Sequence, residues 1–148
     1  MKMKRKLILS LLAMLLPISA WCADGDTFEY TPDGSNVKFY FRILSESEKT
    51  IELYRDGSRA AVVNAEYEYG DVGTSISVPS SVDYNSTIYA LAKIGDSAFE
   101  LCQMTTVILP EGVKVIGRGA FENCHMLTTI NLPSSLISIE SGAFYGCI

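Results

Sequence analysis

A pattern of apolar and small residues recurs three times in the last third of the chain. Each copy has an isoleucine, then Ala-Phe, then a cysteine at matching offsets: Ile94 to Cys102, Ile116 to Cys124 and Ile139 to Cys147. Their phenylalanines, Phe99, Phe121 and Phe144, lie 22 and 23 residues apart. A fixed period of this size is typical of a solenoid, in which each unit buries its apolar face only by stacking on its neighbours.

Between the copies, apolar residues alternate with polar ones, as in half-buried strands. Val107 and Leu109 are expected to point inward, as are Ile130 and Leu132, and a proline ends each strand because it cannot donate to a ladder. We expect each Ala-Phe pair to fill the opposite wall from a short helical turn. The predicted core comprises Ile94, Ala98, Phe99, Cys102, Val107, Leu109, Val113, Ile116, Ala120, Phe121, Cys124, Leu127, Ile130, Leu132, Leu136, Ile139 and Phe144.

The first repeat unit is longer than the others. Val113 and Ile116 are three residues apart, whereas the matching Val82 and Ile94 are twelve apart. The difference is a nine-residue insertion near residues 83–93, and Asn85-Ser86 within it fits a two-residue hairpin turn. The sequence therefore predicts a β-hairpin that projects from the first coil.

Residues 24–73 carry no trace of the repeat and read as short strands. Val37, Phe39, Phe41 and Ile43 alternate with polar or amphipathic residues, and Pro32-Asp33-Gly34 is a turn signal. We expect an antiparallel β layer that caps the first coil, because terminal repeats need a polar outer face. The predicted organisation is this N-terminal β cap followed by about three repeats over 74–148, the last of them incomplete.

Residues 1–23 have the features of a secretory signal peptide. Lys2 to Lys6 form a basic start, and Leu7 to Ile18 is an apolar run too short to span a bilayer. Small residues follow, which predicts cleavage between Ala20 and Ala23, export to the cell surface or medium, and no transmembrane helix in the mature chain. Lipid anchoring at Cys22 is the less favoured alternative, because Trp21 is a poor residue before a lipoprotein cysteine.

The net charge of the chain disfavours nucleic acid as a partner. The whole chain has a formal net charge of −5, and residues 1–23 contain four basic residues and no acid. The mature chain is therefore more acidic still, with no basic stripe to neutralise phosphates, which argues against nucleic acid as a partner.

The repeats resemble the BspA-like, Treponema-type leucine-rich repeats of bacterial surface proteins. The shared pattern is Ile-Gly-x-x-Ala-Phe-x-x-Cys-x-x-Leu-x-x-Ile-x-Leu-Pro, which Ile116 to Pro133 follows throughout; in the third copy Glu140 replaces the glycine. The resemblance covers about residues 69–148 well and 24–68 loosely. It implies a right-handed repeat superhelix, export, and non-enzymatic roles such as adhesion and the binding of host or matrix proteins.

The sequence offers little for catalysis. His125, the single histidine, directly follows Cys124, so the two side chains are expected to diverge rather than form a nucleophilic pair. No ligand spacing suggests a metal site and no motif suggests a cofactor. Three cysteines share one repeat position and fit a stack of small buried hydrophobes better than a disulfide, which is the alternative.

The best binding candidate is the outward face of the repeat strands. By alternation it carries Ser75, Thr106 and Thr129 in one row, and Ser77, Ile108 and Asn131 in the next. Tyr84 and Tyr89 on the projecting hairpin are second candidates, because exposed tyrosines are favoured in interfaces. The sequence thus predicts a secreted module that binds an extracellular protein or glycan. The alternative is a structural piece of a longer surface solenoid, or self-association through an open C-terminal end.

Overall fold

The computed structural model describes residues 23–55, 61–64 and 75–148, and these residues form strands and turns without any helix. The signal-peptide prediction for residues 1–23 and the lipidation site Cys22 lie, apart from Ala23, outside the described residues. The strands are β1 (Thr27–Tyr30), β2 (Val37–Ser45), β3 (Thr50–Leu53), β4 (Val62–Asn64), β5 (Ser75–Ser77), β6 (Ser81–Tyr84), β7 (Thr87–Ile94), β8 (Thr106–Ile108), β9 (Val115–Ile116), β10 (Thr129–Asn131) and β11 (Ser138–Ile139).

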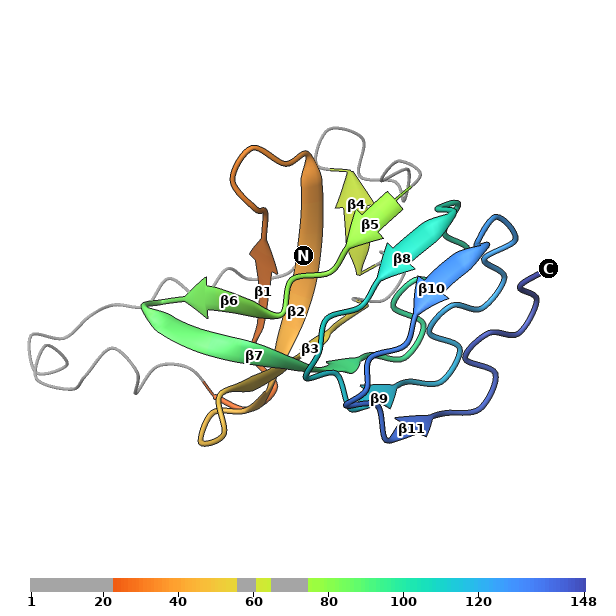
Figure 1. The fold of residues 1–148 in the computed structure, drawn as a ribbon. Coiled ribbons are helices and arrows are strands. Elements are labelled where there is room, and N and C mark those ends of the chain that lie inside the picture. The colour runs from red at the N-terminus through yellow and green to blue at the C-terminus, as the bar shows by residue number, and fades with distance from the viewer. Residues whose placement is uncertain (1–22, 56–60, 65–74) are drawn as a thin grey trace, which may run out of the picture.

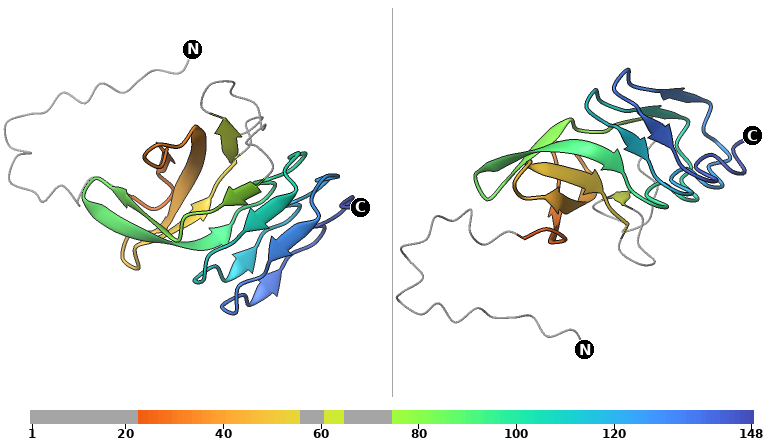
Figure 2. Two further views of the ribbon diagram at one scale, coloured as in Figure 1. Left: turned by 45° about the horizontal axis from the view of Figure 1, so that its top comes forward. Right: turned by 90° about the horizontal axis from the view of Figure 1, so that it is seen from below.

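The repeats build two parallel ladders. One is a three-stranded sheet in the order β10-β8-β5, and the other is the run β7-β9-β11 within an eight-stranded sheet. Figures 1 and 2 show the coils lying side by side in chain order, with the C-terminus at the far end from the N-terminal strands. Each coil therefore contributes one strand to each ladder. The alternation predicted the strands β8 and β10, but not the second ladder, to which β9 and β11 belong.

A column of stacked phenylalanines runs through the coils. The ring centroids of Phe99 and Phe121 are 4.9 Å apart, and the ring planes are 7° from parallel. The ring centroids of Phe121 and Phe144 are 5.2 Å apart, and the ring planes are 1° from parallel. Each fully buried ring removes enough apolar surface from water to contribute about 1.5–3 kcal/mol. The column is therefore a main source of cohesion between coils.

Most of the predicted core is buried, but the last coil departs from it. The fully buried set is Ile94, Ala98, Phe99, Cys102, Val107, Leu109, Val113, Ile116, Ala120, Phe121 and Cys124. Leu127, Ile130, Leu136 and Phe144 are half-buried and pack against that set. The prediction was wrong for Leu132 and Ile139, which are 51% and 46% exposed. Their counterparts one coil earlier, Leu109 and Ile116, are buried because a following coil covers them.

The predicted helical turns were also wrong. The third side of each coil, which we call the turn wall (residues 95–102, 117–124 and 140–147), is a run of consecutive β-turns. In the second coil Ala120, Glu122 and Cys124 each donate their N–H to the carbonyl three residues back. The intervening N–H groups of Gly119, Phe121 and Asn123 donate instead to the next coil, which no α-helix could do.

Left-handed residues make this alternation possible. Gly119, Gly142 and Gly146 have positive φ, as do the equivalent Ser97, Leu101 and Asn123. At Gly117 the constraint is space rather than φ, because a Cβ there would lie 2.9 Å from the Asp96 nitrogen. The glycines of the repeat thus serve both turn geometry and the close approach of successive coils.

The N-terminal strands continue the repeat sheet instead of lying over it as a separate antiparallel layer. β1, β2 and β3 pair antiparallel with one another, and β4 pairs with β2. β3, however, pairs in parallel with β7, the first repeat strand of this ladder. The N–H of Gly95 donates to Leu53 O at 2.9 Å, just as Gly117 donates to Ile94 O at 2.8 Å. β3 therefore occupies the place of a preceding coil.

The inserted hairpin is present and consists of β6 and β7. Tyr84 pairs with Thr87, which leaves Asn85-Ser86 as a two-residue loop with φ of 53° and 62°. Positive φ at both positions is the type I′ turn, whose twist matches that of the flanking strands. The arm does not project freely, because Tyr84 stacks on Phe28 of β1 with ring centroids 4.0 Å apart.

Candidate functional site

The outer face of the β5/β8/β10 sheet brings together six side chains from three coils. The parallel register pairs Ser75 and Thr129 with Thr106, and Ser77 and Asn131 with Ile108. The alternate residues Ile76 and Val107 are buried on the inner side, and Ile130 is half-buried there. The strand pleat therefore turns both predicted rows outward, and we call these six residues the outer face.

The outer face is uncharged. Ser75, Ser77, Thr129 and Asn131 are exposed, Thr106 is half-buried, and Ile108 is 47% exposed. Hydroxyls and amides can both donate and accept hydrogen bonds, and Ile108 adds an apolar contact. None of the six side chains is acidic or basic, so the face is suited to recognition rather than to proton transfer.

Asn131 has a structural task in addition to any contact with a ligand. Its Oδ1 accepts the Leu109 N–H at 2.7 Å, and its Nδ2 donates to Leu109 O at 2.8 Å. The side-chain amide thus satisfies the backbone of Leu109 just beyond the end of β8. No local signal in the sequence marks this role, because the bond joins residues 22 apart in the chain.

The two tyrosines that were predicted to bind a partner differ in their exposure. Tyr84 is half-buried against Phe28, whereas Tyr89 is fully buried, so its prediction as an exposed binding residue was wrong. Alternation along β7 places Tyr89 inward with Leu91 and turns Ile88 outward, 67% exposed. The error arose because the N-terminal strands, which the repeat pattern does not describe, pack against this side of the hairpin.

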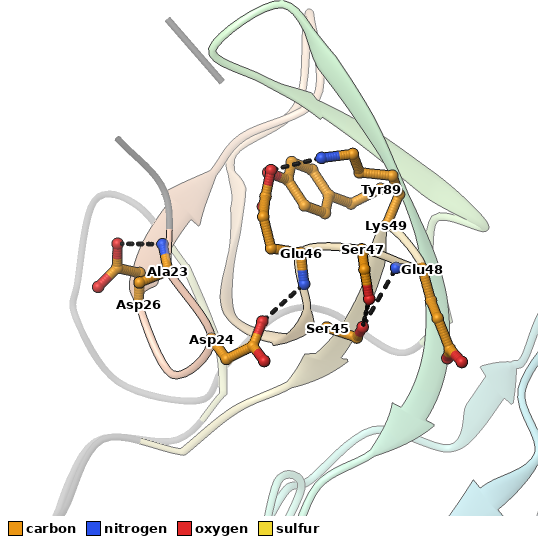
Figure 3. A network of polar contacts seen from close by, with 9 residues as sticks. All are labelled: Ala23, Asp24, Asp26, Ser45, Glu46, Ser47, Glu48, Lys49 and Tyr89. Carbon is orange, nitrogen blue, oxygen red and sulfur yellow. Dashed lines mark hydrogen bonds and ion pairs between the residues drawn. The ribbon is translucent and has the colours of Figure 1, made fainter. Parts of the chain in front are cut away.

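A polar network fixes Tyr89 in place. Its hydroxyl donates to Glu46 at 2.5 Å, and Lys49 pairs with the same carboxylate (Figure 3). The bonds from Lys49 and then Tyr89 hold the pKa of Glu46 below its usual value. The Glu46 N–H in turn donates to Asp24 Oδ1 at 2.7 Å. These contacts anchor the turn between β2 and β3 to β7, which is a structural role.

No catalytic arrangement emerges within residues 23–55, 61–64 and 75–148. His125 is exposed and its Nδ1 lies 2.9 Å from Gly146 O, whereas the Cys124 thiol is buried and donates to Phe99 O at 3.0 Å. Their side chains thus bond to different coils, the third and the first. The described residues also contain no group of three His, Cys, Asp or Glu side chains placed to hold a metal ion.

The cysteines form a ladder of thiols in the described part of the chain. Cys102, Cys124 and Cys147 are free, and the Cys147 thiol donates to Phe121 O at 3.2 Å, one coil beyond the equivalent Cys124 bond. Burial raises the pKa of Cys102 to about 12 and that of Cys124 to about 11. These two thiols stay protonated at neutral pH and are not nucleophiles.

Comparison with known proteins shows which family the repeats resemble. Residues 92–148 match the family model described as "BspA type Leucine rich repeat region (6 copies)". No curated protein matches the chain. No helix of the described residues is long and apolar enough to cross a membrane.

Three solved structures share this fold. A T. pallidum leucine-rich repeat protein is 25% identical with a TM-score of 0.56 over 78% of this chain, which spans only 45% of that protein. A leucine-rich repeat protein from Bacteroides capillosus is also 25% identical, with a TM-score of 0.56 over 77% of this chain and 87% of its own. One from Bacteroides ovatus, 23% identical, has a TM-score of 0.52 over 81% of this chain and 33% of its own. Residues 92–148 are therefore similar to BspA-type leucine-rich repeats, and the chain shares the fold of these leucine-rich repeat proteins.

Proposed function

We propose that this chain is an exported, non-enzymatic module that binds an extracellular protein or glycan through the outer face. The observation that carries the proposal is the register of β5, β8 and β10, which aligns six uncharged side chains from three coils on one surface. Repeat proteins recognise partners through continuous surfaces of this kind. An adhesin-type role at the cell surface agrees with the family of the repeats and with the basic and apolar start of the sequence.

The N-terminal strands act as a cap on the first coil of the proposed module. β3 supplies the preceding partner for β7, and the Ala61 N–H donates to Ala98 O at 3.0 Å where an earlier coil would otherwise do so. Stacked coils that are closed at one end in this way favour a solenoid with a definite beginning. We therefore propose that the N-terminal strands cap a right-handed superhelix.

A second candidate function is structural. Leu132 and Ile139 in the last coil are more exposed than their buried counterparts Leu109 and Ile116. That difference favours a role in which another coil covers the last one. The covering coil would belong either to a longer surface solenoid or to a second copy of this chain.

The first test is binding of the mature chain to an array of purified extracellular matrix proteins and mammalian glycans, followed by affinity measurement on the strongest ligand. Ile108→Glu and Thr129→Lys should each weaken binding at least tenfold, about 1.4 kcal/mol, because each places a charge on an otherwise uncharged outer face. Asn131 is left intact because its replacement would disturb the Leu109 backbone.

Ile88→Glu is the matched control. It makes the same change at an exposed isoleucine on the hairpin, away from the outer face. Loss of binding in Ile88→Glu but not in Ile108→Glu would move the site to the hairpin and contradict the proposal. Mass spectrometry of the exported chain should also find a new N-terminus between residues 20 and 24.

A further inference from the structure

Hydrogen bonds fix the first described residues of the chain as far back as the nitrogen atom of Ala23. The Ala23 N–H donates to Asp26 Oδ2 at 3.0 Å (Figure 3). The Asp26 N–H donates in return to Ala23 O, also at 3.0 Å. Residues near a chain terminus are usually poorly ordered unless such contacts hold them. Ala23 is held here through both its nitrogen and its oxygen.

Strand β2 fastens this small turn to the rest of the fold. The Gly25 N–H donates to Ile43 O at 2.8 Å, and the Ile43 N–H donates to Asp26 O at 2.8 Å. These two bonds fix the backbone immediately before and at Asp26. The Asp26 carboxylate therefore lies beside the Ala23 nitrogen on a backbone whose position β2 already sets.

The charge around this nitrogen is negative. Residues 23–37 contain no lysine or arginine, and their acids are Asp24, Asp26, Glu29 and Asp33. Carboxylates close to an amino group favour its charged form. A positive charge at the Ala23 nitrogen would therefore be stabilised.

The sequence before Ala23 favours one peptide bond for removal of the leader. A secretory leader carries small residues one and three positions before the cleaved bond. Ala20 and Cys22 meet this requirement for the Cys22–Ala23 bond. Every other bond between residues 20 and 24 places Ile18 or Trp21 at one of these two positions.

We propose that the exported chain begins at Ala23 and that its new α-ammonium group forms an ion pair with Asp26. Hydrolysis adds one water molecule across the Cys22–Ala23 bond, so that the leader leaves with a carboxylate and Ala23 keeps an ammonium group. The nitrogen released is the atom that already lies 3.0 Å from Asp26 Oδ2. The inference rests on the proposed export, but not on ligand binding at the outer face.

Cleavage at this bond changes the strength of an existing contact. It converts a hydrogen bond from a neutral amide into one between two charged groups, which is shorter and stronger. Exposed ion pairs usually contribute little, in part because two long side chains lose their freedom. Here one partner is a backbone nitrogen and the other is a short side chain on a fixed backbone. Processing should therefore stabilise the corner between β1 and β2.

The first experiment is mass spectrometry of the full chain after expression with its leader. The exported protein should have Ala23 as its first residue. An exported chain that begins at any other residue, including a lipid-modified Cys22, would overturn the inference and leave export intact. A chain retained in the cell with its leader would overturn the proposed export and the processing site with it.

A second measurement tests the ion pair by itself. The chain that begins at Ala23 is compared with one that begins a residue earlier and carries Cys22→Ser, which moves the ammonium group away from Asp26. The chain that begins at Ala23 should have a urea unfolding midpoint higher by at least about 0.2 M. Asp26→Asn keeps an acceptor oxygen but removes the charge, so it should abolish this difference.

Asp33→Asn is the matched control, because it removes an exposed carboxylate from the turn between β1 and β2. The difference between the two chains should persist in this variant. Equal midpoints for the two chains, or a difference that survives in Asp26→Asn, would overturn the ion pair. None of these results bears on the outer face, which the Ile108→Glu comparison tests separately.

Discussion

Single residues gain their roles here from the coil next to them. Asn131 lies on an exposed strand, yet its amide holds the backbone of Leu109 in the preceding coil. The Cys124 thiol likewise donates a hydrogen bond to Phe99 O in the preceding coil. Repetition at one offset makes such bonds additive along the stack, because each coil repeats the donor and the acceptor.

The thiol ladder predicts a specific alkaline instability. Because the folded-state pKa values of Cys102 and Cys124 lie above the ordinary value of 9.0, their stabilising effect is complete below pH 9. It is lost as the pH rises toward 11 to 12, because the unfolded chain releases those protons first. Urea unfolding midpoints between pH 7 and pH 11 should therefore fall more steeply for the native chain than for Cys102→Ala/Cys124→Ala. Equal slopes would show that the thiols do not contribute.

At the scale of elements, turns rather than strands give the repeat its particular form. The strands are only two or three residues long in β8 to β11, and the turn wall adds three backbone bonds from each coil to the next. Ser97, Leu101 and Asn123 adopt left-handed conformations. For most residues other than glycine this conformation costs about 1–2 kcal/mol. The Ala-Phe spacing was compatible with a helical turn, and only the bonds to neighbouring coils exclude it.

The β6–β7 turn offers a direct test of this cost. Ser86 has φ of 62° at the second position of a type I′ turn, where glycine has no Cβ to strain. Ser86→Gly should raise the free energy of unfolding by about 1 kcal/mol. Ser86→Ala, which keeps the Cβ, is the control and should bring no gain in urea unfolding. A glycine variant no more stable than the alanine variant would contradict the turn assignment.

At the scale of the whole molecule, a buried ion pair joins the N-terminal strands to the repeats. Glu52 of β3 is 1% exposed and accepts from Arg42 Nε of β2 at 2.6 Å, and Lys93 Nζ of β7 lies 3.6 Å from it. The Arg42 guanidinium also covers the Tyr54 ring at 4.3 Å. The three charges occupy neighbouring strands of one sheet, so the N-terminal region and the first coil form one structural unit.

Breaking that pair should destabilise the whole chain. Arg42→Leu leaves Glu52 buried with Lys93 as its remaining cation and should lower the free energy of unfolding by about 3 kcal/mol. Arg42→Leu/Glu52→Leu removes both charges and should recover most of the loss, in a single cooperative transition. Two separate transitions would instead show that the N-terminal strands unfold independently of the repeats.

Much of this protein could be predicted from its sequence by itself, because periodicity reports burial directly. The recurrence of Ile, Ala-Phe and Cys predicted the stacked coils and the phenylalanine column, and the alternation between the copies predicted the outward rows. The twelve-residue separation of Val82 and Ile94 predicted the hairpin. Tertiary structure decided the rest. Tyr89 is buried because β1 and the β2–β3 turn pack against the hairpin, and β3 is parallel to β7 although its own neighbour β2 is antiparallel. Leu132 is exposed where Leu109 is buried, although both occupy the same place in the repeat. These outcomes depend on contacts between segments far apart in the chain, and a local pattern carries no record of which segment will cover it.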